Sequence, residues 1–302
     1  MTSKSWLSLG IVVLGTTSLA AQNAPTSYKG LCEASAGVYI DDNHFVVASD
    51  ETNVLRLYVR DDTSIGIALD FQGASGFDKS DIEAAAKAGD TVYWISSHSL
   101  NSNGEDKKKR KIFFATKIVT RNGSTTLEWG GSFLLLRDEI LGVAGIQQSD
   151  LNIEGMAAAP DGGLFIGLRD TLGGNALIIP FKNPSEVIED PDKKPNLGTP
   201  FTLALAGKGV RGMEQTENGY LIVAGPESDE GDFSLYRWPG GAKPAVEVKE
   251  DNFAPLRPEA IMRVPGKNIM QVLSDDGGED CDDEVSPVSK RAFRSRDFEI
   301  ND

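Results

Sequence analysis

The sequence lacks most of the residues and motifs by which enzymes are commonly identified. Its 302 residues include only two cysteines and two histidines, and the GxSxG, HExxH and P-loop patterns are all absent. These absences exclude an assignment by signature to nucleophile-elbow hydrolases, zinc peptidases or P-loop nucleotide-binding enzymes. Basic residues are also few: 30 Lys and Arg stand against 45 Asp and Glu, and the net charge is −15. We therefore expect a small-molecule ligand rather than nucleic acid or an anionic membrane.

Long apolar stretches are lacking after the first twenty residues, so we expect no membrane span. The beginning of the chain has the pattern of a signal peptide: Lys4 precedes an apolar run over residues 6–19. Ser18-Leu19-Ala20 then fits the small-x-small cleavage rule, with cleavage after Ala20 or Ala21. We predict a signal peptide over residues 1–20 and one domain over residues 21–302, monomeric and exported by a bacterium to the periplasm or the medium.

Signals for long helices are scarce, whereas Gly, Pro and Asx-Gly turns are frequent, which favours many short strands. Residues 151–181 show the pattern best. Glu154 opens a run of small residues, Asp161-Gly162-Gly163 reverses the chain, and an apolar run returns to Arg169. In an antiparallel hairpin the first residue of one strand lies beside the last residue of the other. Glu154 and Arg169 are therefore predicted to lie together.

The same unit occurs five times along the chain. Its first strand begins, in order, at Glu33, Glu83, Glu154, Arg211 and Glu259. Its second strand ends, in the same order, at Asp50-Glu51, Ser97-His98, Arg169, Gly225-Pro226 and Asp275-Asp276. The two ends are 15 to 17 residues apart in every unit. Because a slip of one residue would exchange the faces of a strand, this regular spacing indicates one repeated geometry.

Further strands follow each hairpin. Third strands are expected at residues 54–59, 111–119, 176–181, 233–238 and 291–300, and fourth strands at 65–71, 126–136, 200–205 and 245–248. Antiparallel units of this size, repeated about fifty residues apart, are typical of the blades of a β-propeller. We predict an all-β, five-bladed propeller, with six blades as the alternative. A two-sheet sandwich would explain the strands but not their five equivalent units.

The last unit has no clear fourth strand. Residues 27–31 could supply it and so close the ring with the N-terminal strand. Cys32 follows this segment, and Cys281 lies near the end of the last unit. A Cys32–Cys281 disulfide, which export would permit, would hold the closure; two unpaired buried thiols are the alternative.

The repeat gathers charged residues at one mouth of the central channel, because the start of each innermost strand and the end of its partner face the same mouth. The inner ring consists of Glu33, Glu83, Glu154, Arg211 and Glu259. The surrounding residues are Asp50, Glu51, His98, Arg169, Asp275 and Asp276. Converging carboxylates are costly unless they bind a cation, share protons or pair with arginine.

The predicted ring has two interpretations. In the first, Glu33, Glu154 and Glu259 bind a hard cation, for which Ca²⁺ is the natural candidate. Arg169 and Arg211 then neutralise the remaining charge. In the second, an Arg–Glu network only locks the blades together.

His98 is predicted at the same mouth beside Glu83, where it could act as a general base or bind a metal; a solvated rim histidine is the alternative. The basic run over residues 107–111 is interpreted as a solvated loop, with a clamp for an anionic ligand over the mouth as the alternative. Two functions agree with these features. One is a Ca²⁺-assisted hydrolase of a small ester, lactone or phosphoester, and the other is a non-catalytic propeller that binds a ligand or a protein.

In the hydrolase, His98, Glu83 and Glu154 are the candidate catalytic residues. The substrate-binding candidates are Glu33, Asp50, Arg169, Arg211, Glu259 and Asp275.

Several short motifs together resemble domain-of-unknown-function family 3616, a group of mostly bacterial proteins. They are Glu33-Ala34-Ser35, Ser49-Asp50-Glu51, Asp81-Ile82-Glu83-Ala84, Asn152-Ile153-Glu154-Gly155 and Gly167-Leu168-Arg169. The resemblance covers nearly all of the chain after residue 20. It implies a β-propeller related to the esterase-like-phytase group and supplies no established reaction. The sequence departs from the family pattern at Glu33, where Asp is more frequent, and at Arg211-Gly212, where the third unit has Glu-Gly.

Overall fold

Five four-stranded antiparallel sheets make up nearly all of the regular structure. The computed structural model describes residues 24–228, 231–248, 253–278, 281–283 and 286–300. The predicted signal peptide, residues 1–20, lies outside the described residues. The sheets are the five blades of a β-propeller. This confirms the predicted fold with five blades rather than six.

Each blade follows the chain from the axis outwards. The first two blades contain β2 (Ala36–Tyr39), β3 (His44–Ser49), β4 (Thr52–Val59) and β5 (Ile67–Asp70), then β6 (Ile82–Ala88), β7 (Thr91–Ser96), β8 (Phe113–Arg121) and β9 (Ser124–Phe133). The third and fourth contain β10 (Ile153–Ala158), β11 (Leu164–Leu172), β12 (Asn175–Phe181) and β13 (Phe201–Leu203), then β14 (Gly209–Thr216), β15 (Gly219–Gly225), β16 (Ser234–Trp238) and β17 (Val246–Val248).

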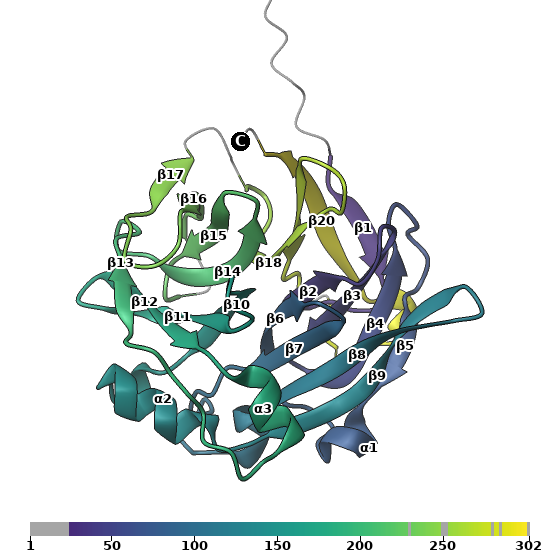
Figure 1. The fold of residues 1–302 in the computed structure, drawn as a ribbon. Helices are drawn as coiled ribbons and strands as arrows, with labels where there is room; N and C mark the ends of the chain where they lie inside the picture. The colour runs from purple at the N-terminus through teal and green to yellow at the C-terminus, as the bar shows by residue number, and fades with distance from the viewer. Residues whose placement is uncertain (1–23, 229–230, 249–252, 279–280, 284–285, 301–302) are drawn as a thin grey trace, which may run out of the picture.

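The fifth blade is assembled from both ends of the domain. It contains β18 (Pro258–Arg263), β19 (Ile269–Ser274), β20 (Ala292–Glu299) and, as its outer strand, β1 (Thr26–Lys29). The prediction that the N-terminal strand closes the ring is therefore confirmed. The strands β2, β6, β10, β14 and β18 surround the axis, each in contact with the next (Figure 1).

The core consists of five apolar clusters, one between each pair of neighbouring blades. Trp94 of β7, for example, is fully buried in the cluster that joins blades one and two. All residues of β7 are buried, because both faces of its sheet pack against another blade. This explains why the second strands read as continuous apolar runs, whereas outer strands such as β5 are largely exposed.

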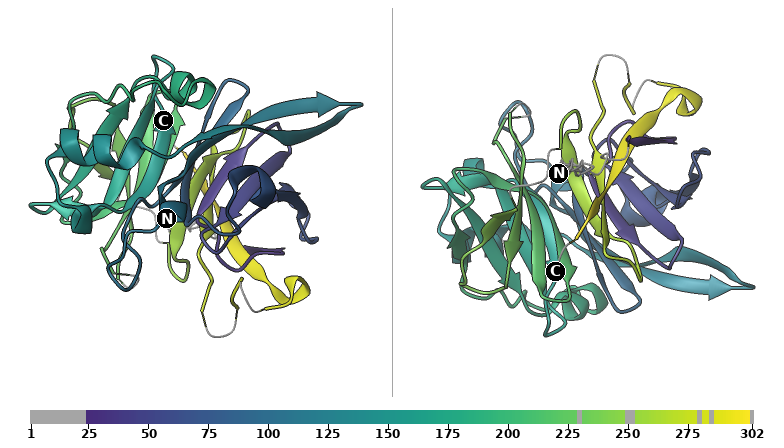
Figure 2. Two further views of the ribbon diagram at one scale, coloured as in Figure 1. Left: turned by 90° about the horizontal axis from the view of Figure 1, so that it is seen from below. Right: turned by 90° about the horizontal axis from the view of Figure 1, so that it is seen from above.

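Helices lie outside the ring. They are α1 (Gln72–Ser75), α2 (Leu136–Ala144) and α3 (Pro184–Glu189), of which α3 contacts β9 (Figure 1). The hairpin of β8 and β9 projects beyond the other blades (Figure 2). Within the described part of the chain, no helix has the length and apolar character required to span a membrane.

The predicted Cys32–Cys281 disulfide is present and joins residues 249 positions apart. Cys32 follows the closing strand β1, and the Cys281 segment precedes β20, with which β1 pairs. The bond therefore adds a covalent link to the hydrogen-bonded closure of the ring.

Removing this disulfide tests how far it stabilises the ring. We expect the Cys32→Ala/Cys281→Ala double variant to lose about 2–5 kcal/mol of unfolding free energy, because the bond restricts a long loop of the unfolded chain. Urea unfolding followed by tryptophan fluorescence measures the loss, with reduced and oxidised wild-type protein as references. An unchanged urea midpoint, or two reactive thiols in the oxidised native protein, would contradict the expectation.

Candidate functional site

A β-bulge at the start of the inner strand brings the charged residue of each repeat to the axis. The register of β6 with β7 shifts between Ile82 and Ala84, which leaves Glu83 outside the ladder. Equivalent shifts fall at Glu154, Arg211 and Glu259. The extra residue of a bulge is unpaired, and its side chain is re-aimed relative to its neighbours. Four equivalent bulges thus turn four charged side chains towards one mouth.

In the first blade, Ser35 rather than Glu33 occupies the equivalent place. Ser35 lines the axis with Glu83, Glu154 and Glu259, and its hydroxyl donates a hydrogen bond to the carbonyl oxygen of Ile82 at 2.5 Å. Ser35 also precedes Asp50 by the 15 residues found in most of the other units. Glu33 lies two residues earlier and pairs through its backbone with Asp275, at the seam between the first and last blades.

The disulfide-linked segment fixes the backbone at this seam. The carboxylate of Asp283 accepts hydrogen bonds from the backbone N–H of Cys32 at 2.8 Å and of Glu33 at 3.3 Å. The N–H of Gly277 donates to Oδ1 of Asp275 at 2.8 Å, and burial raises the pKa of Asp275. Ring closure therefore positions two of the predicted site residues.

Arginine neutralises one side of the mouth. The guanidinium of Arg211 lies between two glutamates: its Nε is 3.0 Å from Oε2 of Glu154, and its Nη2 bonds Oε1 of Glu259. Nη1 of Arg169 donates to Oε1 of Glu154 at 2.8 Å, as the repeat predicted. Arg211 and Glu154 are only 2% and 4% exposed. Blades three to five thus contribute two arginines and two glutamates that pair with one another.

Carboxylates are in excess on the opposite side, at blades one and two. One oxygen from each of Asp50, Asp81 and Glu83 lies within 4.8 Å of the other two, and Glu33, Asp50 and Glu51 form a second group of this kind. Asp50 is common to both groups. Among the residues that the structure describes, Asp50, Glu33 and Glu83 form no ion pair.

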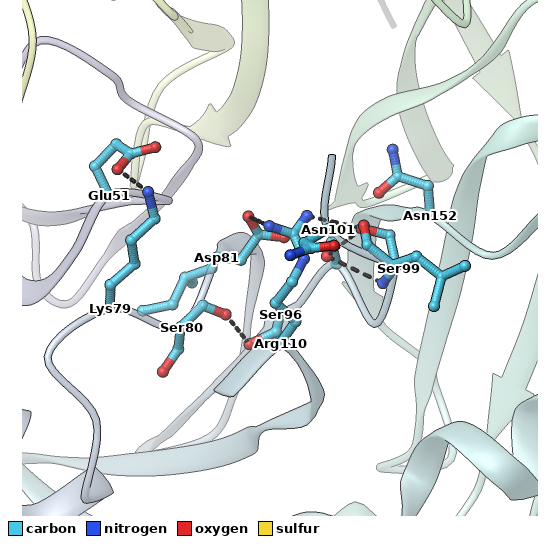
Figure 3. Close-up of polar contacts among 12 residues, drawn as sticks. Glu51, Lys79, Ser80, Asp81, Ser96, Ser99, Asn101, Arg110 and Asn152 are labelled. Atoms are coloured by element: carbon cyan, nitrogen blue, oxygen red, sulfur yellow. Dashed lines mark hydrogen bonds and ion pairs between the residues drawn. The ribbon is translucent and has the colours of Figure 1, made fainter. Parts of the chain in front are cut away.

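Two bases reach this acidic side from neighbouring loops. Nη1 of Arg110 is 2.5 Å from Oδ1 of Asp81, and Lys79 bonds Glu51 (Figure 3). Arg110 also donates to the hydroxyl of Ser99 at 2.8 Å, within the same polar loop. Arg137 at the start of α2 bonds the carbonyl of Ser99 at 2.7 Å and so holds this loop against the mouth. Sequence reasoning gave no role to Asp81, whose signal was its place two residues before Glu83. It interpreted residues 107–111, which include Arg110, as a solvated loop, with a clamp over the mouth as the alternative; the ion pair of Arg110 with Asp81 places this residue at the mouth.

Burial and mutual repulsion raise the pKa values of these carboxyl groups. Burial, followed by repulsion from Asp50 and Asp275, raises the pKa of Glu33 to about 8. Burial, followed by Asp81 and Glu259, likewise raises the pKa of Asp50 to about 8. The pKa of Glu83 is raised well above its usual value, first by burial. At neutral pH these groups retain protons unless a cation replaces them.

His98 lies beneath the rim rather than on it. Its ring is fully buried, and neither ring nitrogen has a hydrogen-bond partner among the described residues. Burial, with Arg137 and Lys111 nearby, lowers its pKa to about 3. A left-handed φ of 55° turns the chain at His98, so that Ser97 holds the rim place equivalent to Arg169. A neutral imidazole with no exposed face has no contact with a ligand in the mouth.

The mouth is a closed cup rather than the entrance to a pore. The axial cavity at this end measures about 10 Å³ and is lined by Glu83, Glu154 and Glu259 of the charged ring together with small side chains such as Ala84 and Gly212. That space is too small for more than about one water molecule. A ligand of the charged mouth therefore enters and leaves through the same opening.

The stability of the protein should respond to pH through Asp50. Its folded-state pKa of about 8 lies above the ordinary value of 3.8, so the folded state holds the proton more tightly. Stability from this group is therefore lost as the pH rises between those values. We expect Asp50→Asn to become more stable than wild type as the pH rises from about 4.5 to 8, by on the order of 2 kcal/mol.

Urea unfolding in the presence of a chelator, at several pH values, measures this difference. The exposed Asp62 supplies the control, since its lowered pKa leaves it ionised throughout this range and Asp62→Asn should run parallel to the wild type between pH 4.5 and 8. An Asp50→Asn variant whose stability runs parallel to that of the wild type would show that Asp50 titrates normally.

The resemblance found in the sequence is confirmed over part of the chain. A family described as "Protein of unknown function (DUF3616)" matches residues 135–269. This segment contains Glu154, Arg169, Arg211 and Glu259, the paired half of the mouth. No curated protein matches the chain.

Solved structures of similar fold have very different sequences. An exo-beta-1,3-galactanase from Phanerochaete chrysosporium is 10% identical with a TM-score of 0.51, over 91% of this chain and 65% of that chain. A mutant of the GH43 protein BlXynB from Bacillus licheniformis is 11% identical with a TM-score of 0.52, over 89% and 54%. The glutaminyl cyclase of Myxococcus xanthus is 11% identical with a TM-score of 0.47, over 91% and 96%. At these identities the likeness is one of fold alone.

Proposed function

We propose that the charged mouth binds a divalent cation, with Ca²⁺ as the expected ion, and hydrolyses a small ester, lactone or phosphoester there. One observation carries the proposal: oxygens of Asp50, Asp81 and Glu83 approach one another within 4.8 Å, with Arg110 as the one base that pairs with this group among the described residues. A hard cation prefers several carboxylate oxygens at such a distance. Binding it would relieve the repulsion that raises the pKa values of these groups.

The geometry favours a different ligand set from the one that the sequence suggested. Glu154 and Glu259 pair with Arg211, which leaves them less available to a cation. Glu33 adjoins the proposed site through Asp50 and would add a further oxygen. The proposed ligands are therefore Asp50, Asp81 and Glu83, with Glu33 beside them.

The two sides of the mouth would divide the chemistry between them. A bound cation would polarise the carbonyl or phosphoryl oxygen of the substrate. Glu83 or Asp50 would accept the proton of the attacking water, because His98 is buried away from the mouth. Arg169, whose side chain is 13% exposed, is the more accessible arginine and would hold an anionic group of the substrate. Arg211, at 2% exposure, would instead position Glu154 and Glu259.

Export is part of the same proposal. Disulfides persist in oxidising compartments, and the Cys32–Cys281 bond agrees with the signal-peptide pattern of residues 1–20. A periplasmic or secreted protein would also meet Ca²⁺ at concentrations suited to weak sites.

A non-catalytic ligand- or protein-binding propeller is the second candidate. It is favoured by the pairing of Glu154 with Arg169 and Arg211, because such a network also serves to lock blades together. In that case the acidic side would hold protons at neutral pH, and the mouth would bind without turnover.

Calcium titration calorimetry tests the cation. We expect wild-type protein to bind one Ca²⁺ with a dissociation constant of about 10⁻⁴ M and Glu83→Gln to bind at least about tenfold more weakly. The matched control is Glu259→Gln, which removes a paired glutamate from the same ring and should change the affinity by less than about threefold. The absence of binding heat in the wild type would remove the cation from the mechanism.

Chromogenic esters, phosphoesters and lactones test the reaction. We expect hydrolysis that a chelator abolishes and that Asp50→Asn slows by about 100-fold in kcat/KM, whereas Asp62→Asn leaves it unchanged. Hydrolysis that resists both the chelator and Asp50→Asn would move the chemistry elsewhere. Calcium binding without turnover of any substrate would favour the non-catalytic function.

A further inference from the structure

The opposite end of the axis contains a second cup. Its cavity measures about 550 Å³, within the range of small-molecule sites. All five inner strands contribute to the lining, through Val38, Ala86, Ala158, Glu214 and Met262 among others. The narrow axial cavity of about 10 Å³ separates this cup from the charged mouth, so the two are independent spaces.

Glu214 is the exception in an otherwise apolar ring. At the third position after the bulge, the other blades carry Ala86, Ala157 and Met262, with Val38 in the first blade. Glu214 takes this position in β14, where it pairs with Leu221. Burial raises its pKa to about 8, against the smaller lowering effects of Arg263 and of the positive charge of Lys87. A carboxyl at an apolar position stabilises nothing by packing, which makes it a candidate for ligand binding.

The cup has an acidic group in its wall, Glu214, and basic groups near its rim, Arg263 and Lys87. The backbone N–H of Arg263 donates to the Glu214 carboxyl, while the guanidinium of Arg263 is held by Glu217 at 2.7 Å. Lys87 is exposed at the rim and forms no ion pair with any residue that the structure describes. Tyr39 of β2 stays neutral, because its pKa is raised to about 12. Among the described residues that line the cup, Glu214 is therefore the acid without an ion pair and Lys87 the base without one.

We propose that this cup binds a small zwitterion, with its ammonium group on Glu214, its carboxylate group at Lys87 and an aliphatic body against Val38, Ala86 and Met262. The ammonium would displace the proton of Glu214, because an enclosed carboxylate is stabilised by a cation of its own. Binding near neutral pH would then release about one proton. An anion alone would leave Glu214 protonated, and a cation alone would leave Lys87 without a partner.

L-Leucine is a suitable probe, and two compounds with nearly the same branched body are its controls. The cation 3-methylbutylammonium lacks the carboxylate, and 4-methylpentanoate lacks the ammonium. We expect L-leucine to bind at least about tenfold more tightly than either control. Calorimetry in buffers of different ionisation enthalpy should show the release of about one proton.

Variants at the two ends of the cup complete the test. Glu214→Gln and Lys87→Met should each weaken L-leucine binding at least about tenfold, and Glu214→Gln should abolish the proton release. Glu83→Gln, at the other mouth, should leave the affinity for L-leucine unchanged. The proposal is overturned if none of the three compounds binds at about 10 mM. It is also overturned if 4-methylpentanoate binds as well as L-leucine, or if Lys87→Met leaves the affinity for L-leucine unchanged. The latter result would indicate that Lys87 pairs with Glu214 and not with the ligand.

Discussion

The space at the axis is the constraint on which the rest of this structure depends. Five strands converge there, and their backbones leave little room for side chains. A Cβ atom added at Gly209 would lie 1.6 Å from the carbonyl oxygen of Arg169, and one at Gly155 would lie 2.4 Å from Cγ1 of Val210. Small residues are therefore required along the inner strands, and they close the channel in its middle. The same crowding divides the axis into two cups that can differ in charge, size and ligand.

The charge distribution of the first cup, the charged mouth, depends on one position of the repeat at which arginine replaces glutamate. Arg211 stands where three other blades carry glutamate, and it lies between Glu154 and Glu259. Removal of one partner from such a buried pair costs about 3–5 kcal/mol of folding stability, because the other charge is left buried and unpaired. The paired side chains on this side of the ring are therefore held in place, and their charges cancel. The excess of carboxylates thereby falls on Asp50, Asp81, Glu83 and Glu33 at blades one and two, and on Asp275 at the seam with blade five. An asymmetric ring of this kind can bind a ligand at one side and hold its shape at the other.

Closure of the ring and construction of the site are physically linked. The strand β1 completes the fifth blade, and the Cys32–Cys281 bond joins the chain on either side of the seam. Asp283, next to the disulfide-linked segment, accepts the backbone N–H groups of Cys32 and Glu33. Loss of closure would thus displace Glu33 as well as weaken the fold.

The sequence by itself determined the repeated hairpins, most of the strands that follow them and the Glu154–Arg169 pair. It favoured five blades and left six as the alternative. These features follow from apolar periodicity and from turns, which act within a few residues of one another. It also placed the two cysteines so that closure could bring them together.

Only the tertiary structure decided which carboxylates meet, because distances between blades depend on bulges and loops that no periodic pattern records. It placed Ser35 rather than Glu33 on the axis, buried His98 beneath the rim and brought Asp81 to Asp50 and Glu83. It also formed a cup around Glu214 from five strands that are far apart in the chain.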